Sequence, residues 1–233
     1  MIAIFKREFK AYFSTPIGFI VLAAYYFFLG LYFELIYGFG SPDINSIIVA
    51  MSTVVVFTVP VLTMRLMSED RRQKVDQALL TAPVKLTGIV LGKFLAALAV
   101  FGICFAPTII FEIIIASYVS VNILSFIYVL FGMLLLGAAL IAIGMFISSL
   151  TESTVISAIL TFVVNILVLY MSSFASMIKV EWIANIIEKA AFINAFENFG
   201  NEIFSVADIV YFLSIIVAFI FLSVRSLEKR RWA

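Results

Sequence analysis

Six runs of apolar residues, separated by short polar segments, dominate the chain. A helix needs about 20 mainly apolar residues to cross the bilayer core, and the runs approach or exceed that length. We therefore predict an all-α integral membrane protein with six transmembrane helices. The runs cover about residues 17–37, 47–64, 89–118, 123–148, 155–177 and 207–224. The third run is longer than the core, and Pro107 predicts a kink within it.

The segment before the first run has the pattern of an amphipathic helix. One helical face is apolar and holds Ile2, Phe5, Phe9, Tyr12 and Phe13. The other face is charged and holds Lys6, Arg7, Glu8 and Lys10. This pattern is typical of a helix that lies in the membrane surface. We expect an interfacial helix over residues 1–15, with a solvated basic leader as the alternative.

The polar segment between the second and third runs predicts a short helix over residues 68–80. Ser68 is suited to cap it, and Pro83 ends it. Two opposite-charge pairs have helical spacing, Asp70 with Lys74 and Arg72 with Asp76. The charged residues from Glu69 to Asp76 would cost roughly 15–20 kcal/mol inside a bilayer, so the segment belongs in water. A solvated loop is the alternative.

Lys and Arg give the orientation of the predicted helices. If the N-terminus is inside, thirteen of the 15 Lys and Arg residues fall on the inner side, and only Lys179 and Lys189 fall outside. Inner loops of membrane proteins carry this excess of positive charge. With six transmembrane helices, both termini lie in the cytoplasm.

The residues before the last run, 178–206, are expected on the outer side as two short helices. Ser205 and Asp208 resemble a capping box for the last transmembrane helix. Four glutamates gather here, Glu181, Glu188, Glu197 and Glu202. They suggest either a cation site or, as we favour, a charged rim on interfacial helices.

Composition agrees with a membrane protein, at 64% hydrophobic and 12% charged residues and a mean hydropathy of +1.20. Six transmembrane helices and short loops account for residues 1–233 as one membrane domain. We therefore expect any energy-supplying domain to lie on another polypeptide. The net charge of +1 gives no reason to expect nucleic acid as a partner.

Catalytic chemistry is not supported by the residue types. The chain has no histidine, which excludes Ser-His and His-metal sites. Gly88 to Lys93 resembles a phosphate loop, but it is one residue short and Phe94 stands where Ser or Thr would hold magnesium. We predict neither catalytic nor metal residues, and no cofactor site in this chain.

Polar residues inside the predicted helices are candidates for lining a translocation path. They fall on the second run, at Thr58 and Thr63, and on the fifth, at Ser157, Thr161 and Asn165. Helix packing is the alternative for each of them. Glu34 and Glu112 lie near the outer ends of their runs, where we expect their carboxylates to reach the headgroups.

The order of these segments resembles the type-2 ABC exporter permeases, in particular the gliding-motility-type and multicopper-enzyme-maturation-type permeases. The motifs that carry the resemblance lie in residues 5–16 and 65–95, including Leu79-Leu-Thr-Ala-Pro83-Val84 and Val90-Leu-Gly-Lys93. The chain departs from the family where Lys74-Val75 replaces a common Gly-Thr. This departure bears on the subfamily.

The resemblance implies a permease in the inner membrane of a prokaryote, which is not an enzyme by itself. Residues 68–80 would be a coupling helix that docks into a separate ABC ATPase, present in two copies with its own ATP and magnesium. The coupling residues would be Glu69, Asp70, Arg72, Val75, Asp76 and Leu79. A homodimer or heterodimer of permeases would form the path, lined by the first, second and fifth helices.

Two other functions remain open. One is a membrane anchor or scaffold in an ATPase-driven complex, for which the same fold would serve. The other is a secondary transporter, which usually carries paired ionisable groups near the midplane and an internal repeat. Neither feature is visible in the sequence, and no residue identifies the substrate.

Overall fold

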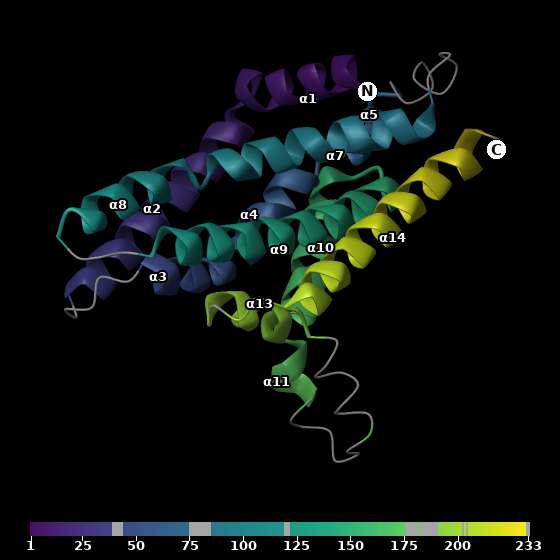
Figure 1. The fold of residues 1–233 in the computed structure, drawn as a ribbon. Helices are drawn as coiled ribbons and strands as arrows, with labels where there is room; N and C mark the ends of the chain where they lie inside the picture. Colours follow the sequence, from purple (N-terminus) through teal and green to yellow (C-terminus); the bar gives the residue numbers. More distant parts are fainter. Residues whose placement is uncertain are drawn as a thin grey trace.

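The computed structural model describes residues 1–38, 44–74, 85–118, 122–175, 182, 191–201, 203 and 205–231. Within these residues the chain forms helices and no strands (Figure 1). The helices are α1 (Ile2–Ser14), α2 (Pro16–Gly38), α3 (Ile44–Ala50), α4 (Ser52–Thr63), α5 (Ser68–Arg72), α7 (Leu86–Ile103), α8 (Ala106–Ala116), α9 (Ile123–Leu150), α10 (Thr154–Leu169), α11 (Met171–Ala175), α13 (Phe192–Gly200) and α14 (Val206–Arg231).

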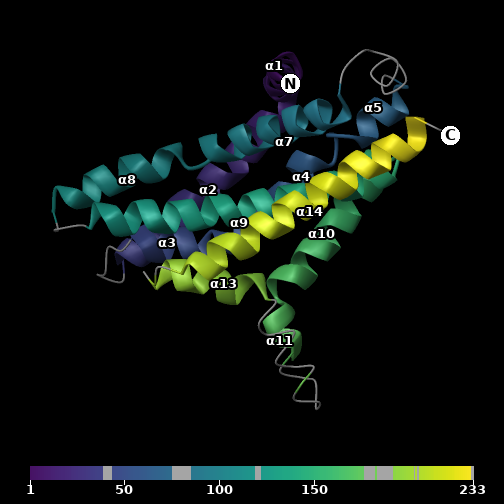
Figure 2. The ribbon, with the colours of Figure 1, turned by 45° about the vertical axis from the view of Figure 1, so that its right-hand side comes forward.

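The central helix of the bundle is α9, which contacts α3, α4, α7, α10, α13 and α14 (Figure 2). Three glycines on it allow neighbours to approach its backbone. Gly132 faces Phe199 of α13, Gly137 faces Phe101 of α7, and Gly144 faces Thr63 of α4. A Cβ at any of the three would overlap the facing side chain. Small residues permit this close packing, which van der Waals contact stabilises in membranes.

The kink predicted in the third apolar run is confirmed as a break between α7 and α8. The helix is interrupted at Cys104 and Phe105, and Pro107 lies in the first turn of α8. Proline has no N–H, so the carbonyl of Ile103 lacks its helical donor. The hydroxyl of Tyr26 on α2 donates to that carbonyl at 3.0 Å. The neighbouring helix thus supplies the missing hydrogen bond.

The second predicted transmembrane helix is divided into α3 and α4, which meet at Met51. Within α4, Pro60 removes another backbone donor, toward the carbonyl of Val56. At the junction, the N–H of Met51 still donates to Ile47 at 3.0 Å and the N–H of Val55 to Met51 at 3.1 Å, so α3 leads directly into α4.

Five described helices are long and apolar enough to cross a membrane, namely Pro16–Ile36, Ser52–Arg72, Leu86–Ala116, Ile123–Leu150 and Val206–Arg230. The helix α10, in the fifth predicted run, has 16 residues. That length corresponds to about 24 Å, less than the roughly 30 Å core. The five residues of α11 follow it directly after Tyr170. A total of six crossings therefore stays a prediction that depends on α10.

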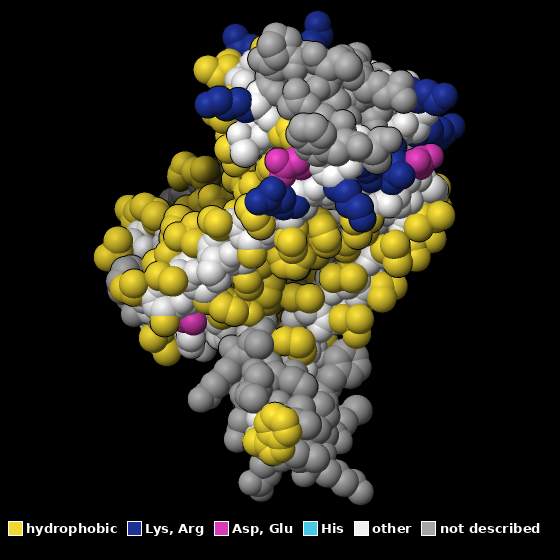
Figure 3. Space-filling model, turned by 90° about the vertical axis from the view of Figure 1, so that its right-hand side faces the viewer, with side chains coloured by type: hydrophobic (Ala, Val, Ile, Leu, Met, Phe, Trp, Pro, Cys, Tyr) yellow, Lys and Arg dark blue, Asp and Glu magenta, His cyan; other side chains and the backbone are white. Residues whose placement is uncertain are grey.

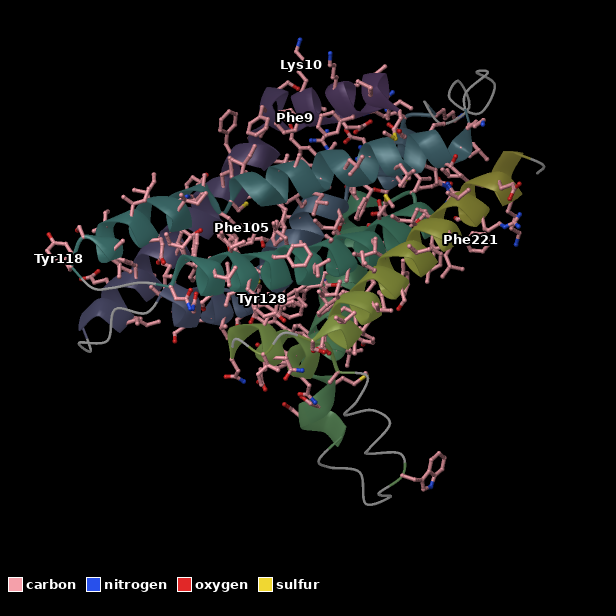
Figure 4. All side chains as sticks on the ribbon, viewed as in Figure 1. Phe9, Lys10, Phe105, Tyr118, Tyr128 and Phe221 are labelled. Carbon is pink, nitrogen blue, oxygen red and sulfur yellow. The ribbon has the colours of Figure 1, made fainter. Side chains whose placement is uncertain are left out.

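Lys and Arg gather at one end of the molecule, where α5 and the last turns of α14 lie (Figure 3). A belt of hydrophobic side chains adjoins this end. On α1, Figure 4 shows Lys10 pointing away from the bundle and Phe9 pointing toward it. Rings of Phe5, Phe9 and Phe13 follow one another at centroid distances of 5.8 and 5.2 Å. The helix predicted over residues 1–15 is therefore present as α1. The predicted faces differ at two positions, since Glu8, predicted on the charged face, is only 14% exposed and Ile2, predicted on the apolar face, is 68% exposed.

Near the opposite end, α13 is one of the two short helices expected before the last run. The other, around residues 181–190, falls outside the described residues except for Trp182. The backbone N–H of Asp208 donates to Ser205 Oγ at 3.3 Å, as predicted for the start of α14. The carboxylate of Asp208 accepts instead from the amide of Asn198 at 2.8 Å. This hydrogen bond ties α13 to α14.

Candidate functional site

The candidate site is the corner between α4 and α7, which we call the α5 corner and define as residues Arg65–Lys74. Its helix is shorter than the predicted helix over 68–80. It runs from Ser68 to Arg72, and Lys74 adopts a left-handed conformation with φ of 56°. A left-handed residue just after the last turn ends a helix. The predicted residues Val75, Asp76 and Leu79 lie outside the described residues.

Ser148 of the central helix α9 forms hydrogen bonds with the backbone at the start of α5. The hydroxyl of Ser148 accepts hydrogen bonds from the backbone N–H groups of Met67 and Ser68, both at 3.1 Å. It also donates to the carbonyl of Met64 at 3.2 Å. The predicted capping role of Ser68 is wrong, because the N-cap position falls on Met67 and Ser68 donates backward to Met64. The cap comes from α9 instead.

A buried lysine connects the corner to two other helices. The side chain of Lys93 on α7 is only 1% exposed. Its ammonium lies 2.7 Å from a carboxylate oxygen of Asp70 and 3.0 Å from one of Glu8 on α1. Arg7 completes the group, with its guanidinium 2.5 Å from Glu8 and 3.5 Å from Asp70. We call these four residues the charge cluster.

The charge cluster is electrically balanced, with two positive and two negative groups. Burial by itself raises the pKa of Glu8, but attraction to Lys93 and hydrogen bonds from Arg7 and Lys93 outweigh it, so the pKa lies below its ordinary value. A buried charge is tolerated only when it is paired and hydrogen-bonded. The geometry of the charge cluster meets that condition.

A second layer of contacts fixes α1 against the same corner. The hydroxyl of Tyr12 donates to the carbonyl of Leu62, at the end of α4, at 2.6 Å. Arg65 pairs with Glu69 one turn later and donates to the hydroxyl of Thr15 at 3.2 Å. Between these groups lies a cavity of about 290 Å³. The corner is therefore attached to α1 through several independent contacts.

The end of α9 holds the other side of the corner. Arg71 lies 2.8 Å from the carboxylate of Glu152 and donates to the carbonyl of Leu150 at 3.1 Å. Arg230, in the last turn of α14, donates to the carbonyl of Ser149. A displacement of α5 would thus act on α1, α7 and α9 directly.

The predicted pairing of Asp70 with Lys74 is replaced by pairing with Lys93 and Arg7. Within the described residues Asp70 makes no ion pair with Lys74. The reason is that the helix ends before Lys74, so the four-residue spacing no longer places the two side chains together. The partner of Arg72 in the second predicted pair, Asp76, is outside the described residues.

The coupling residues that the structure describes divide into two groups. Glu69 and Asp70 are partly buried and hydrogen-bonded within the protein. Arg72 is exposed, as are Gln73 and Lys74. Only the second group faces outward, where another molecule can bind.

The candidate path residues lie inside the chain. Thr58 and Thr63 on α4 are 5% and 0% exposed. The candidates on α10, each 0% exposed, are Ser157, Thr161 and Asn165. In the described arrangement they lie where α4, α9 and α10 meet, so they do not reach the outer surface of the chain.

The two glutamates of the apolar runs differ in burial. Glu34 is exposed on α2, as expected for a carboxylate that reaches the headgroups. Glu112 on α8 is 7% exposed, so it packs inside the protein instead.

Sequence reasoning did not find the role of Lys93. In the sequence, the motif that ends at Lys93 resembles a motif of the permease family. It does not fit a phosphate loop. A usable signal was present, since a lysine two turns inside an apolar helix requires an acidic partner. Sequence spacing did not identify Glu8 as that partner, because the two residues are 85 positions apart.

The helices and the charged corner define a multi-pass α-helical membrane protein with one basic end. Comparison with protein families gives a more specific result. A model of the ABC-2 family transporter protein matches residues 39–225, and the chain belongs to that family. No curated protein matches the chain significantly.

Membership makes the chain a permease subunit of an ATP-binding-cassette (ABC) transporter. Such a permease is a membrane transport component that is not catalytic by itself, and the family implies an ATPase partner. The subgroup named in the sequence analysis stays a prediction.

Proposed function

We propose that this permease belongs to an exporter and that the α5 corner is where the ATPase binds. The observation that carries the proposal is the buried ammonium of Lys93, which joins α5 to α1 and α7 through Asp70 and Glu8. A binding surface transmits force only if it is fastened to the helices that move. The α5 corner is fastened to α1, α7 and α9, while Arg72 remains exposed at its tip.

In this proposal the basic end of the molecule faces the cytoplasm, and both termini lie there. Two ATPase subunits bind two permeases, which form a homodimer or a heterodimer. ATP-driven closure of the ATPases pushes the α5 corners, and the charge cluster passes the displacement to α1 and α7. The sixth crossing is α10 extended by α11, and the path runs between the two permeases.

The test separates docking from folding with one charge reversal and a matched control. Arg72→Glu reverses an exposed charge at the tip of the corner, and Lys10→Glu reverses an exposed charge on the outer face of α1. We expect Arg72→Glu to weaken co-purification of the ATPase by about tenfold or more. An acidic group on the ATPase that pairs with Arg72 would then face a like charge, which costs several kcal/mol at an interface. Lys10→Glu should leave the complex intact.

Both variants should unfold at the temperature of the unmodified permease, since neither charge is buried. Equal ATPase binding by Arg72→Glu and the unmodified chain would show that the ATPase docks elsewhere. Direction of transport is tested separately, by accumulation of cargo in inside-out vesicles after addition of ATP. An importer would leave such vesicles empty.

A further inference from the structure

The inner face of α10 is polar, whereas its outer face is apolar. Ser157, Thr161 and Asn165 follow one another at four-residue spacing and are fully buried. We call these three residues the α10 stripe. On the opposite face, Ile159 and Val163 are about half exposed, at 57% and 46%. The helix therefore turns its hydrogen-bonding groups toward α4 and α9 and its apolar groups toward the outside of the chain.

The polar residues of α4 and α10 differ in how their hydrogen bonds are satisfied. On α4, the hydroxyl of Thr58 donates to the carbonyl of Val54 at 3.2 Å, and that of Thr63 donates to Val59 at 3.0 Å. These threonines are satisfied within their own helix. In the α10 stripe, both hydroxyls and both amide atoms of Asn165 have no hydrogen-bond partner among the described residues.

Four such atoms in two turns of one helix require a physical explanation. Buried polar groups in proteins are almost always hydrogen-bonded. In a bilayer the requirement is stricter, because lipid offers neither donor nor acceptor. An apolar stripe of the same shape would avoid this cost entirely. The side chains of the α10 stripe are therefore suited to a ligand that has hydrogen-bonding groups.

Such a ligand has no room in the described arrangement at the level of Thr161. There the three helices meet, because a Cβ on Gly144 would overlap Thr63 and lie 2.8 Å from Cγ2 of Thr161. A water molecule needs its own volume and several polar partners. The stripe therefore binds its ligand only after α10 has moved away from α4 and α9.

The attachments of α10 permit such a movement. Within the described residues no ion pair involves α10. Its contacts to α4 include a ring contact between Phe57 and Phe162 and a long hydrogen bond between the hydroxyls of Thr53 and Tyr170, at 3.3 Å. On α4, Pro60 leaves the carbonyl of Val56 without its helical donor. Pro60 thus interrupts the backbone hydrogen bonds of α4, whereas the unsatisfied side-chain atoms of the α10 stripe lie on α10.

We propose that the α10 stripe is a binding site for neutral hydrogen-bonding groups, which opens when α10 moves off α4 and which admits water in that open state when cargo is absent. The ligand is neutral because the stripe holds hydroxyls and an amide and no charged side chain. The site lies within one permease, so it is separate from the path between two permeases. It also does not depend on ATPase docking.

The test uses the purified full-length permease in phosphatidylcholine vesicles, without ATPase or cargo. Cys104, the one native cysteine, is replaced by Ala. Ser157→Cys and Thr161→Cys are then compared with Ile159→Cys, on the exposed apolar face of the same helix. The probe is 2-aminoethyl methanethiosulfonate, a water-soluble reagent that reacts with thiolate. A thiol held in lipid should react at least about tenfold more slowly, since one unit of pKa lowers the thiolate fraction tenfold.

We expect rapid labelling at both stripe positions and slow labelling at Ile159→Cys. A second change, Asn165→Leu, should slow labelling of Ser157→Cys about tenfold and raise the unfolding temperature, because an apolar side chain favours the closed contact. Asn165→Gln, which keeps the amide, should preserve fast labelling. Equally slow labelling at stripe and control positions would overturn the proposal.

Discussion

The ammonium of Lys93 lies 2.7 Å from the carboxylate of Asp70, which connects α7, two turns inside the helix, to the α5 corner at the basic end of the bundle. Glu8 contacts the same ammonium from α1. One buried cation thus holds together three elements that are distant along the chain. This arrangement leads to a prediction about charge removal that distinguishes a paired cluster from a simple packing contact.

Removing Lys93 alone should be far more harmful than removing the whole charge cluster. In Lys93→Met, the carboxylates of Glu8 and Asp70 remain partly buried with only Arg7 nearby. Breaking a buried ion pair on one side costs about 3–5 kcal/mol, whereas replacing all its members is often nearly neutral. We therefore expect a marked loss of thermal stability for Lys93→Met.

The variant that combines Lys93→Met with Arg7→Met, Glu8→Gln and Asp70→Asn should recover most of that stability. Lys85→Met, an exposed lysine at the start of α7, is the matched control and should unfold like the unmodified protein. Thermal unfolding in detergent micelles measures all three. If the fourfold variant is no more stable than Lys93→Met, burial of charge is not what makes the single change harmful.

The contact of α1 with the bundle should weaken in acid. The pKa of Glu8 is lower in the folded protein than its ordinary value of 4.5, so the folded state favours the ionised form. Its contribution to stability is complete above about pH 4.5 and is lost as the pH falls through the folded pKa.

The measurement compares the unfolding temperatures of the unmodified protein and Glu8→Gln as a function of pH. Their difference should be constant above about pH 4.5 and should shrink below it. If the difference stays the same from pH 6 down to the acid limit of folding, this role of Glu8 is contradicted.

Tyr26→Phe should destabilise the junction of α7 and α8. It removes the donor to the carbonyl of Ile103, which Pro107 has left without its helical partner. An unsatisfied buried carbonyl costs about 1–3 kcal/mol. Adding Pro107→Ala to Tyr26→Phe should restore part of the loss, because alanine supplies the missing N–H. Tyr32→Phe on the same helix should have little effect, and equal losses for both tyrosines would contradict the prediction.

Gly144→Ala should destabilise the protein by pushing α4 and α10 away from α9 where the three helices meet. The added methyl group would overlap Thr63 and press on Thr161, and overpacking of this kind costs about 1–3 kcal/mol. Gly102→Ala on α7 is the matched control, since nothing lies within 4 Å of its added methyl group. That change should be neutral or should stabilise the helix by up to about 1 kcal/mol. Unfolding temperatures of the two variants test the contrast.

Local patterns in the sequence predicted the elements that local forces determine. The two faces of α1 follow from helical spacing, and the break near Pro107 follows from the missing N–H of proline. The last turn before Lys74 is different, because a left-handed residue there ended the helix that charge spacing favoured. Asp70 pairs instead with Lys93 of α7. The buried ammonium of Lys93 gives a stronger interaction than an exposed pair with Lys74.

The site was harder to predict than the fold for the same reason. The hydroxyl of Ser148 and the ammonium of Lys93 are determined by how helices cross, and sequence periodicity says only which face each helix buries. The same limit applies to the polar residues of α4 and α10. They look alike in the sequence, yet only the threonines of α4 satisfy their hydrogen bonds within their own helix.

The ion pair between Glu8 and Lys93 also constrains how the chain is made. A ribosome completes α1 first, and the ammonium that neutralises Glu8 is added 85 residues later. Until then, Glu8 lacks the ammonium that lies 3.0 Å from its carboxylate in the folded protein. Insertion of α7 then brings the ammonium of Lys93 to Glu8 on α1. The ion pair that joins α1 to α7 therefore forms only after the synthesis of both helices.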